Sequence, residues 1–179
     1  MMCQNEMRLE FDSRSCNESF ARVAVAAFMT QLNPTLEEVA DVKTAVSEAV
    51  TNSIIHAYGE SFRRTQLRSL QEERCVEKIE ITCRICGNVL EVEVRDTGCG
   101  IADVKRAMEP MFTTRAECDR AGMGFAFMEA FMDTLEVDSK LGKGTTVRMS
   151  KRIAWENTAH LETASAERRR ADGWNTPLR

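Results

Sequence analysis

A carboxylate and an amide lie one helical turn apart in the segment 46–56, where four positions separate Glu48 from Asn52. On a helix this spacing places both side chains on one face. An amide carbonyl is a suitable ligand for Mg²⁺, and the carboxylate beside it then stays available to take a proton from an attacking hydroxyl. The pair therefore predicts Asn52 as the Mg²⁺ ligand and Glu48 as the general base. The alternative is a solvent-exposed glutamate, which is what most helical glutamates are.

His56 follows Asn52 at the same spacing. A histidine there can contact a phosphate of a bound nucleotide or make a structural hydrogen bond, and the structural role is the more common one. Both interpretations remain open from the sequence.

The second motif is Asp96-Thr97-Gly98-Cys99-Gly100, directly after a predicted strand. We expect the Asp96 carboxylate at the edge of the sheet, where it can accept a hydrogen bond from the exocyclic amine of adenine and discriminate against guanine. Gly98 and Gly100 allow a flat ring to approach the backbone closely. The same residues also fit an ordinary Asp-x-Gly turn.

The third motif, Gly122-Met123-Gly124-Phe125, opens a further helix, and we expect all four residues to bind the nucleotide. Unpaired N–H groups and the positive end of the helix dipole make a helix start suitable for phosphate, although a Gly-x-Gly can also be a plain turn. Hydroxyl and guanidinium groups that would add contacts to the β- and γ-phosphates precede it, namely Thr113, Thr114, Arg115 and Arg120. Together the three motifs predict an ATP site without a Walker loop.

The elements that position these motifs follow from periodicity. Residues 7–11 alternate as a strand, and two helical stripes follow, each opened by a predicted capping box: Ser15 with Glu18 for a helix reaching residue 32, and Thr35 with Glu38 for one reaching about Tyr58. Residues 79–85 and 90–94 alternate as a hairpin, 103–108 suggests a short helix, and 125–135 has a helical period. A last hairpin begins at residue 137, turns at 141–144 and continues to 149.

The fold class is therefore an α/β (α+β) two-layer sandwich, in which helices collect on one face of a mostly antiparallel sheet. A chain of 179 residues, 43% of them hydrophobic, fits one domain. It shows neither a run of about 20 apolar residues nor a signal-peptide core, so we expect a cytoplasmic protein. Its net charge of -4 argues against nucleic acid as the main partner, and its seven cysteines read as free thiols.

The ordered motifs resemble a known family, the anti-sigma F factors of sporulation. This family is the serine-kinase branch of the GHKL ATPases, which share the Bergerat ATP-binding fold. The resemblance is carried by residues 17–22, 46–56, 110–114 and 122–125, and it extends over residues 5–153 with an interruption at 61–77. It implies a kinase and anti-sigma domain over 1–153 with an inserted surface segment at about 60–78. The C-terminal extension 154–179 has a composition typical of disorder.

The resemblance also implies roles for individual residues. Glu48 matches the general base and Arg120 the lid arginine near the γ-phosphate. Asp96 matches the adenine-reading aspartate, with Gly98 and Gly100 as its turn, and Thr145 matches a threonine that lines the adenine pocket.

For partners, the resemblance implies a sigma factor that is bound and inhibited, and an anti-anti-sigma factor that is phosphorylated on a serine with Mg-ATP. Arg22 matches an arginine that contacts these partners, and a homodimer is the usual state. The alternative is a nucleotide-dependent anti-sigma binding module without kinase turnover. The segment at 61–77 is longer than in the family, and the chain extends beyond residue 153. Either difference could change which sigma factor the protein binds.

Overall fold

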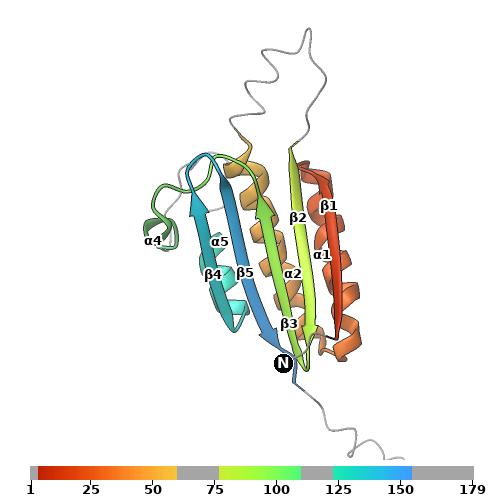
Figure 1. Cartoon of the computed structure of the whole chain (residues 1–179). Coiled ribbons are helices and arrows are strands. Elements are labelled where there is room, and N and C mark those ends of the chain that lie inside the picture. The colour runs from red at the N-terminus through yellow and green to blue at the C-terminus, as the bar shows by residue number, and fades with distance from the viewer. Residues whose placement is uncertain (1–3, 60–76, 110–122, 155–179) are drawn as a thin grey trace, which may run out of the picture.

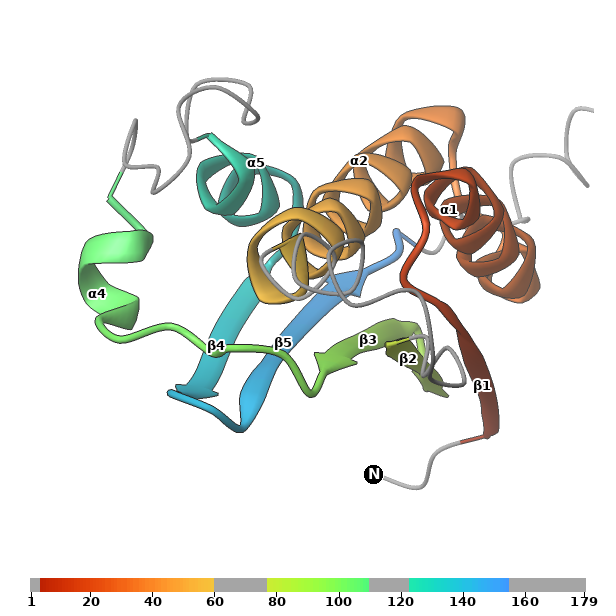
Figure 2. The ribbon, with the colours of Figure 1, turned by 90° about the horizontal axis from the view of Figure 1, so that it is seen from above.

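The structure is a computed structural model, and it describes residues 4–59, 77–109 and 123–154. Five strands form one antiparallel sheet in the order β1-β2-β3-β5-β4, and the helices cover one of its faces (Figures 1 and 2). The strands are β1 Asn5–Asp12, β2 Lys78–Cys86, β3 Val89–Asp96, β4 Thr134–Lys140 and β5 Gly144–Arg152. The predicted two-layer sandwich is confirmed.

The helical layer consists of α1 Ser15–Met29, the short 3-10 turn η1 Thr30–Leu32, α2 Leu36–Asn52, the π-helix η2 Ser53–Ala57, α4 Val104–Ala107 and α5 Gly124–Phe131. Helix α2 lies between α1 and α5 and packs against both (Figure 2). A residue on α2 can therefore face α1 or α5, depending on its position in the helical repeat.

The two predicted capping boxes have different outcomes. At α2 the box is confirmed, because the Thr35 hydroxyl accepts a bond from the Glu38 N–H at 3.2 Å and the Glu38 carboxylate accepts one from the Thr35 N–H at 2.7 Å. At α1 it is wrong. The N-cap residue is Arg14, which makes no side-chain cap, and Glu18 instead accepts a hydrogen bond from the distant Ser47.

The helix predicted over 125–135 is too long at its C-terminal end. Helix α5 ends at Phe131, and Met132 is extended with φ -112° and ψ 151°. The N–H of Asp133 already donates to the carbonyl of Ser150 at 2.8 Å, so the chain has joined β5. Of the predicted surface segment at about 60–78, only Glu77 and Lys78 are described, and Lys78 begins β2. The predicted loop at 110–121 and the extension from 155 lie outside the described residues.

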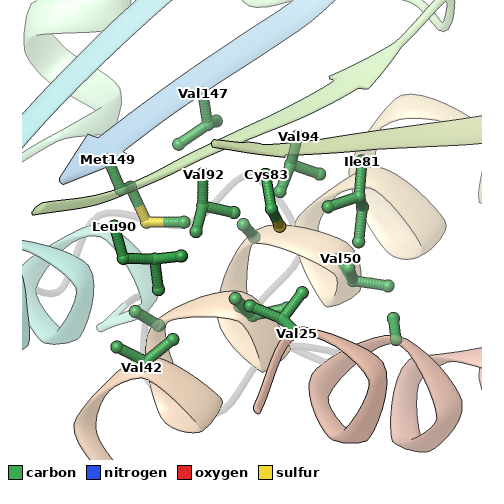
Figure 3. Packing of buried hydrophobic residues seen from close by; sticks show 14 of the residues in the cluster. Val25, Val42, Val50, Ile81, Cys83, Leu90, Val92, Val94, Val147 and Met149 are labelled. Atoms are coloured by element: carbon green, nitrogen blue, oxygen red, sulfur yellow. The ribbon is translucent and has the colours of Figure 1, made fainter. Parts of the chain in front are cut away.

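The core lies between the sheet and the helices. Figure 3 shows Val25, Val42 and Val50 from the helices meeting apolar side chains of β2, β3 and β5. Alternate residues of β3 are buried on this face, as period-2 patterning predicts: Leu90, Val92, Val94 and finally Asp96. Each buried aliphatic side chain contributes about 1.5–3 kcal/mol. The apolar layer therefore holds the helices over the sheet and carries one carboxylate at its end.

The reading of the cysteines as free thiols holds for Cys16, Cys83 and Cys99 and is wrong for Cys86, which is disulfide-bonded. Burial raises the pKa of the Cys83 thiol to about 12, so this residue packs in the core and does not react. Within the described ranges, no helix has both the length and the apolarity needed to cross a membrane.

Candidate active site

A cavity of about 280 Å³ opens between the helical layer and one end of the sheet. Its wall combines α2, η2, α4 and α5 with the ends of β3 and β5 and the loop after β3. The lining residues are Ala49, Asn52, Ser53, His56, Ala57, Asp96, Ile101, Ala102, Asp103, Arg106, Ala107, Gly124, Phe125, Thr145 and Val147. Six of the residues singled out from the sequence are among them, namely Asn52, His56, Asp96, Gly124, Phe125 and Thr145.

Asp96 is the buried acceptor of this cavity, with 4% of its surface exposed. It ends the central strand β3 on the face that packs against the helices. Its Oδ1 accepts hydrogen bonds from the N–H groups of Gly98 at 2.9 Å and Thr145 at 3.1 Å. Its Oδ2 accepts one from the Ser53 hydroxyl at 3.1 Å.

These contacts set the protonation of the Asp96 carboxyl. Burial raises its pKa above the ordinary 3.8, and the three hydrogen bonds oppose that rise because they favour the ionised form. A carboxylate oxygen has room for two hydrogen bonds, and only the Ser53 hydroxyl donates to Oδ2 among the described residues. Asp96 can therefore still accept a hydrogen bond from a ligand amine.

The loop after Asp96 is held from both sides. On the helical side, the Cys99 N–H donates to the Ala57 carbonyl at 3.0 Å, and a Cβ on Gly98 would lie 2.5 Å from the same oxygen. On the sheet side, the Gly142 N–H donates to the Cys99 carbonyl at 2.8 Å. Gly98 is required because any side chain would push the loop away from η2.

Two polar side chains of α2, those of Glu48 and Asn52, lie close to Gly124 at the start of α5. A Cβ built on Gly124 would lie 3.2 Å from Oε2 of Glu48 and 3.2 Å from Nδ2 of Asn52. The spacing argument for Glu48 and Asn52 therefore holds in the structure, and both side chains meet the first residue of α5. An amide carbonyl is a hard oxygen donor that suits Mg²⁺, so Asn52 fits that ion, and the Glu48 carboxylate lies beside it.

His56 also lines the cavity, on the same side as Asn52, as its spacing of four residues predicts. The segment Ser53–Ala57 is π-helical, so the turn after Asn52 contains an extra residue. The backbone carbonyl of His56 accepts a bond from the Cys99 thiol at 3.2 Å.

The remaining sequence-derived site residues divide into three groups. Glu48, Gly98, Gly100 and Met123 are described and do not line the cavity. Arg22 lies on α1, on the far side of α2 from α5 (Figure 2). Thr113, Thr114, Arg115, Arg120 and Gly122 lie outside the described residues.

Two residues that support Asp96 and its loop were missed by sequence reasoning. Ser53 is a buried hydroxyl that continues the apolar stripe of α2, and this position was its only signal. Tyr58 gave no signal beyond ending a helix. Its hydroxyl accepts the Thr97 N–H at 2.8 Å and donates to the Lys78 carbonyl at 2.7 Å, which ties the loop to the start of β2.

The fold and the cavity define a class of nucleotide-binding proteins. Residues 17–151 match the family model described as "Histidine kinase-like ATPase domain". The crystal structure of the RsbU and RsbW domains of Rv1364c from Mycobacterium tuberculosis contains the same fold, with a TM-score of 0.55 and 15% identity over 84% of this chain and 33% of that chain.

Curated relatives narrow the class. The anti-sigma F factor of Thermoanaerobacter sp. (strain X514) is 55% identical over 149 residues, which is 83% of this chain and 94% of the relative. The anti-sigma F factors of Clostridium botulinum (strain Eklund 17B / Type B) and Bacillus subtilis (strain 168) are 52% and 46% identical, over 85% and 84% of this chain and 97% and 94% of the relatives. The chain therefore belongs to the anti-sigma F factor family.

Proposed function

We propose that this protein binds and inhibits a sigma F-like sigma factor and uses Mg-ATP to phosphorylate a serine on an anti-anti-sigma factor. The observation that carries the kinase half is the approach of Glu48 and Asn52 to Gly124 at the cavity whose wall also holds the buried Asp96. The cavity lining thus includes the Asp96 carboxylate and the Asn52 amide, and the Glu48 carboxylate approaches Gly124 in that lining, which supports the roles of adenine acceptor, metal ligand and base proposed for them. The family supports the regulatory half.

Asp96 accepts the exocyclic amine of adenine in this proposal. Ser53, Gly98 and Thr145 fix its carboxylate, so the acceptor is already ordered before the nucleotide arrives. Guanine carries a carbonyl in place of that amine, and two acceptors facing each other would repel. Thr145 also lines the pocket beside the base.

Glu48 accepts the proton of the substrate serine as its hydroxyl oxygen attacks the γ-phosphate. Asn52 would hold Mg²⁺, which neutralises charge on the phosphates. The first turn of α5, from Gly124, offers backbone N–H groups and the positive end of a helix dipole to the same phosphates. We retain Thr113, Thr114, Arg115 and Gly122 as phosphate contacts and Arg120 as the arginine near the γ-phosphate.

Arg22 is the proposed contact for the protein partners. It lies on α1 between Phe20 and Val23, whose surfaces are 54% and 57% exposed. Helix α2 separates this surface from α5, so a substrate partner held on α1 must extend past α2 to bring its serine to the nucleotide (Figure 2). We also propose that the protein is a homodimer in the cytoplasm.

Transfer of labelled phosphate from ATP to the anti-anti-sigma factor tests the kinase half. We expect Glu48→Gln to reduce transfer about 100-fold or more, since a general base contributes roughly 10² to 10⁴. Its affinity for ADP should stay unchanged, and Glu37→Gln on the same helix should behave as the wild type. Normal transfer by Glu48→Gln would remove Glu48 as the base.

The same assay separates kinase activity from the alternative. A wild-type protein that binds ATP and the anti-anti-sigma factor but transfers no phosphate would be a nucleotide-dependent binding module. For the regulatory half, co-purification with a sigma F-like factor is measured in ADP and in ATP. No binding in either nucleotide would contradict the anti-sigma role.

A further inference from the structure

Ser47 and Glu48 are neighbours on α2 with different surroundings. Glu48 approaches Gly124 of α5, whereas the Ser47 hydroxyl donates to Oε1 of Glu18 on α1 at 2.5 Å. This bond joins two helices through partly buried side chains that lie 29 residues apart in the chain.

Glu18 in turn contacts Arg22, one helical turn later on α1. Nε of Arg22 lies 3.5 Å from the same Oε1, with the acidic residue N-terminal to the basic one, which is the favourable order in a helix. Ser19 completes the cluster, since its hydroxyl donates to Oε2 of Glu18 at 3.2 Å and accepts from Nη2 of Arg22 at 3.3 Å. Four side chains therefore form one connected group.

The Arg22 side chain has a buried part and an exposed part. Its Nε is buried and makes no hydrogen bond to any described residue, so the ion pair with Glu18 is the contact that holds it. The side chain as a whole is 41% exposed, and that of Glu18 is 18% exposed. The guanidinium is thus held by Glu18 directly and through Ser19, which itself binds Glu18, and Ser47 fixes that carboxylate from the neighbouring helix.

We propose that Ser47 is a positioning residue for partner binding. It holds Glu18, and Glu18 holds the Arg22 guanidinium in one orientation before a partner arrives. Ordering a long side chain in advance reduces the entropy lost on binding. This inference rests on the proposed function, because it takes Arg22 as the partner contact.

Because Ser47 lies away from the nucleotide cavity, its substitution should affect partner binding and not phosphoryl transfer. The group formed by Ser47, Glu18, Ser19 and Arg22 includes no residue that lines the nucleotide cavity. Ser47→Ala should therefore weaken binding of the sigma factor and raise KM for the anti-anti-sigma factor, each by roughly tenfold, the lower end of the effect of losing one charge-assisted hydrogen bond. The affinity for ADP and kcat should stay within about twofold of the wild type.

Three further variants make the test specific. Ser47→Thr keeps a hydroxyl and should restore binding. Thr44→Ala is the matched control, because Thr44 lies on the same helix and its hydroxyl donates to the carbonyl of Ala40. In a double-mutant cycle, Ser47→Ala should add nothing to Arg22→Ala. Full wild-type binding by Ser47→Ala, or a full additional loss in the double variant, would overturn the proposal.

A measurement on the free protein separates this proposal from the proposed function. In protein labelled with ¹⁵N-arginine, the Arg22 Nε–H should exchange with water faster in Ser47→Ala than in the wild type or Thr44→Ala. Unchanged exchange would show that Ser47 does not hold the guanidinium. If exchange increases but Arg22→Ala binds both partners normally, the partner role of Arg22 is wrong, and Ser47 orders a side chain that partners do not use.

Discussion

The hydroxyl of Ser53 lies 3.1 Å from Oδ2 of Asp96, so the π-helix η2 and the end of β3 meet at a buried carboxylate. Ser53 is 5% exposed and Asp96 is 4% exposed. Burial alone would favour the neutral acid, and the three donors to Asp96 work against this. Asp96 is therefore a buried acceptor whose orientation its donors fix, and each donor is expected to contribute to nucleotide affinity.

Ser53→Ala should weaken ADP binding by about tenfold, the effect of losing a hydrogen bond to a charged group. The Ser53 hydroxyl lowers the pKa of Asp96, so its removal raises that pKa. In the variant, a larger fraction of Asp96 is therefore protonated at acidic pH and cannot accept the adenine amine in the same way. Calorimetric titration with ADP between pH 5 and 8 should show a loss that deepens toward low pH. Ser53→Thr, which keeps the hydroxyl, is the control, and a loss independent of pH would mean that Ser53 acts only by packing.

Asp96→Asn should abolish measurable ATP binding and stabilise the nucleotide-free protein by about 1 kcal/mol, since it removes a buried charge. The amide oxygen of the new asparagine can still accept hydrogen bonds from Gly98 and Thr145. Its NH₂ group, however, would face the Ser53 hydroxyl and the adenine amine, and it cannot accept a hydrogen bond from the adenine amine.

The pH dependence of this stabilisation has a definite sign. The pKa of Asp96 in the folded protein is raised above its ordinary 3.8, so burial of the neutral acid is favourable below about pH 4 and that advantage is lost as the pH rises through the folded value. Urea unfolding should show equal stability of the two proteins below that pH and a growing gap in favour of Asp96→Asn above it. A gap that shrinks with rising pH would contradict the argument.

Much of the fold is predictable because the two-residue repeat of its strands and the 3.6-residue repeat of its helices are clear in the sequence. Alternation in β2 and β3 gives the hairpin, and its continuation places Asp96 on the buried face. The box of Thr35 and Glu38 is local, so four residues suffice to recognise it. Residues 132–135 fit both a helical and an alternating pattern, so the sequence does not fix the end of α5 at Phe131.

The errors at the site arise from contacts that the sequence does not contain. Glu18 has the spacing of a capping residue relative to Ser15, but α1 begins at Ser15 with Arg14 as its N-cap, so the register of the box is wrong and the Glu18 carboxylate binds Ser47 instead. The π-helical form of the turn at Ser53–Ala57 leaves no mark in an apolar repeat, although His56 still lines the same cavity as Asn52. Ser53 itself gains its role only when β3 brings Asp96 beside it.

Gly124→Ala should lower kcat for phosphoryl transfer by roughly tenfold or more. The new Cβ would lie 3.2 Å from both Oε2 of Glu48 and Nδ2 of Asn52, so these groups must shift by a few tenths of an ångström, and catalytic geometry tolerates little displacement. Alanine is also the better helix former, by about 0.5–1 kcal/mol, so the melting temperature should be unchanged or slightly raised. A protein that melts earlier would indicate general damage to α5.

Lys151→Met should destabilise the fold by about 2 kcal/mol. Lys151 is 13% exposed, and its ammonium lies 3.0 Å from Oδ2 of Asp41 on α2 and donates to the carbonyl of Phe131, the last residue of α5, at 2.7 Å. Its loss leaves a partly buried carboxylate without a cation and a helix end without its cap.

Arg148→Met on the same strand is the matched control for this change. It breaks the exposed pair of Arg148 with Glu93, whose side chains are 48% and 28% exposed, and such pairs contribute at most about 1 kcal/mol. Urea unfolding of both variants should give a clearly larger loss for Lys151→Met. Adding Asp41→Asn to Lys151→Met should recover part of that loss, because no unpaired charge remains. Equal losses for the two single variants would mean that β5 does not hold α2 and α5 together through Lys151.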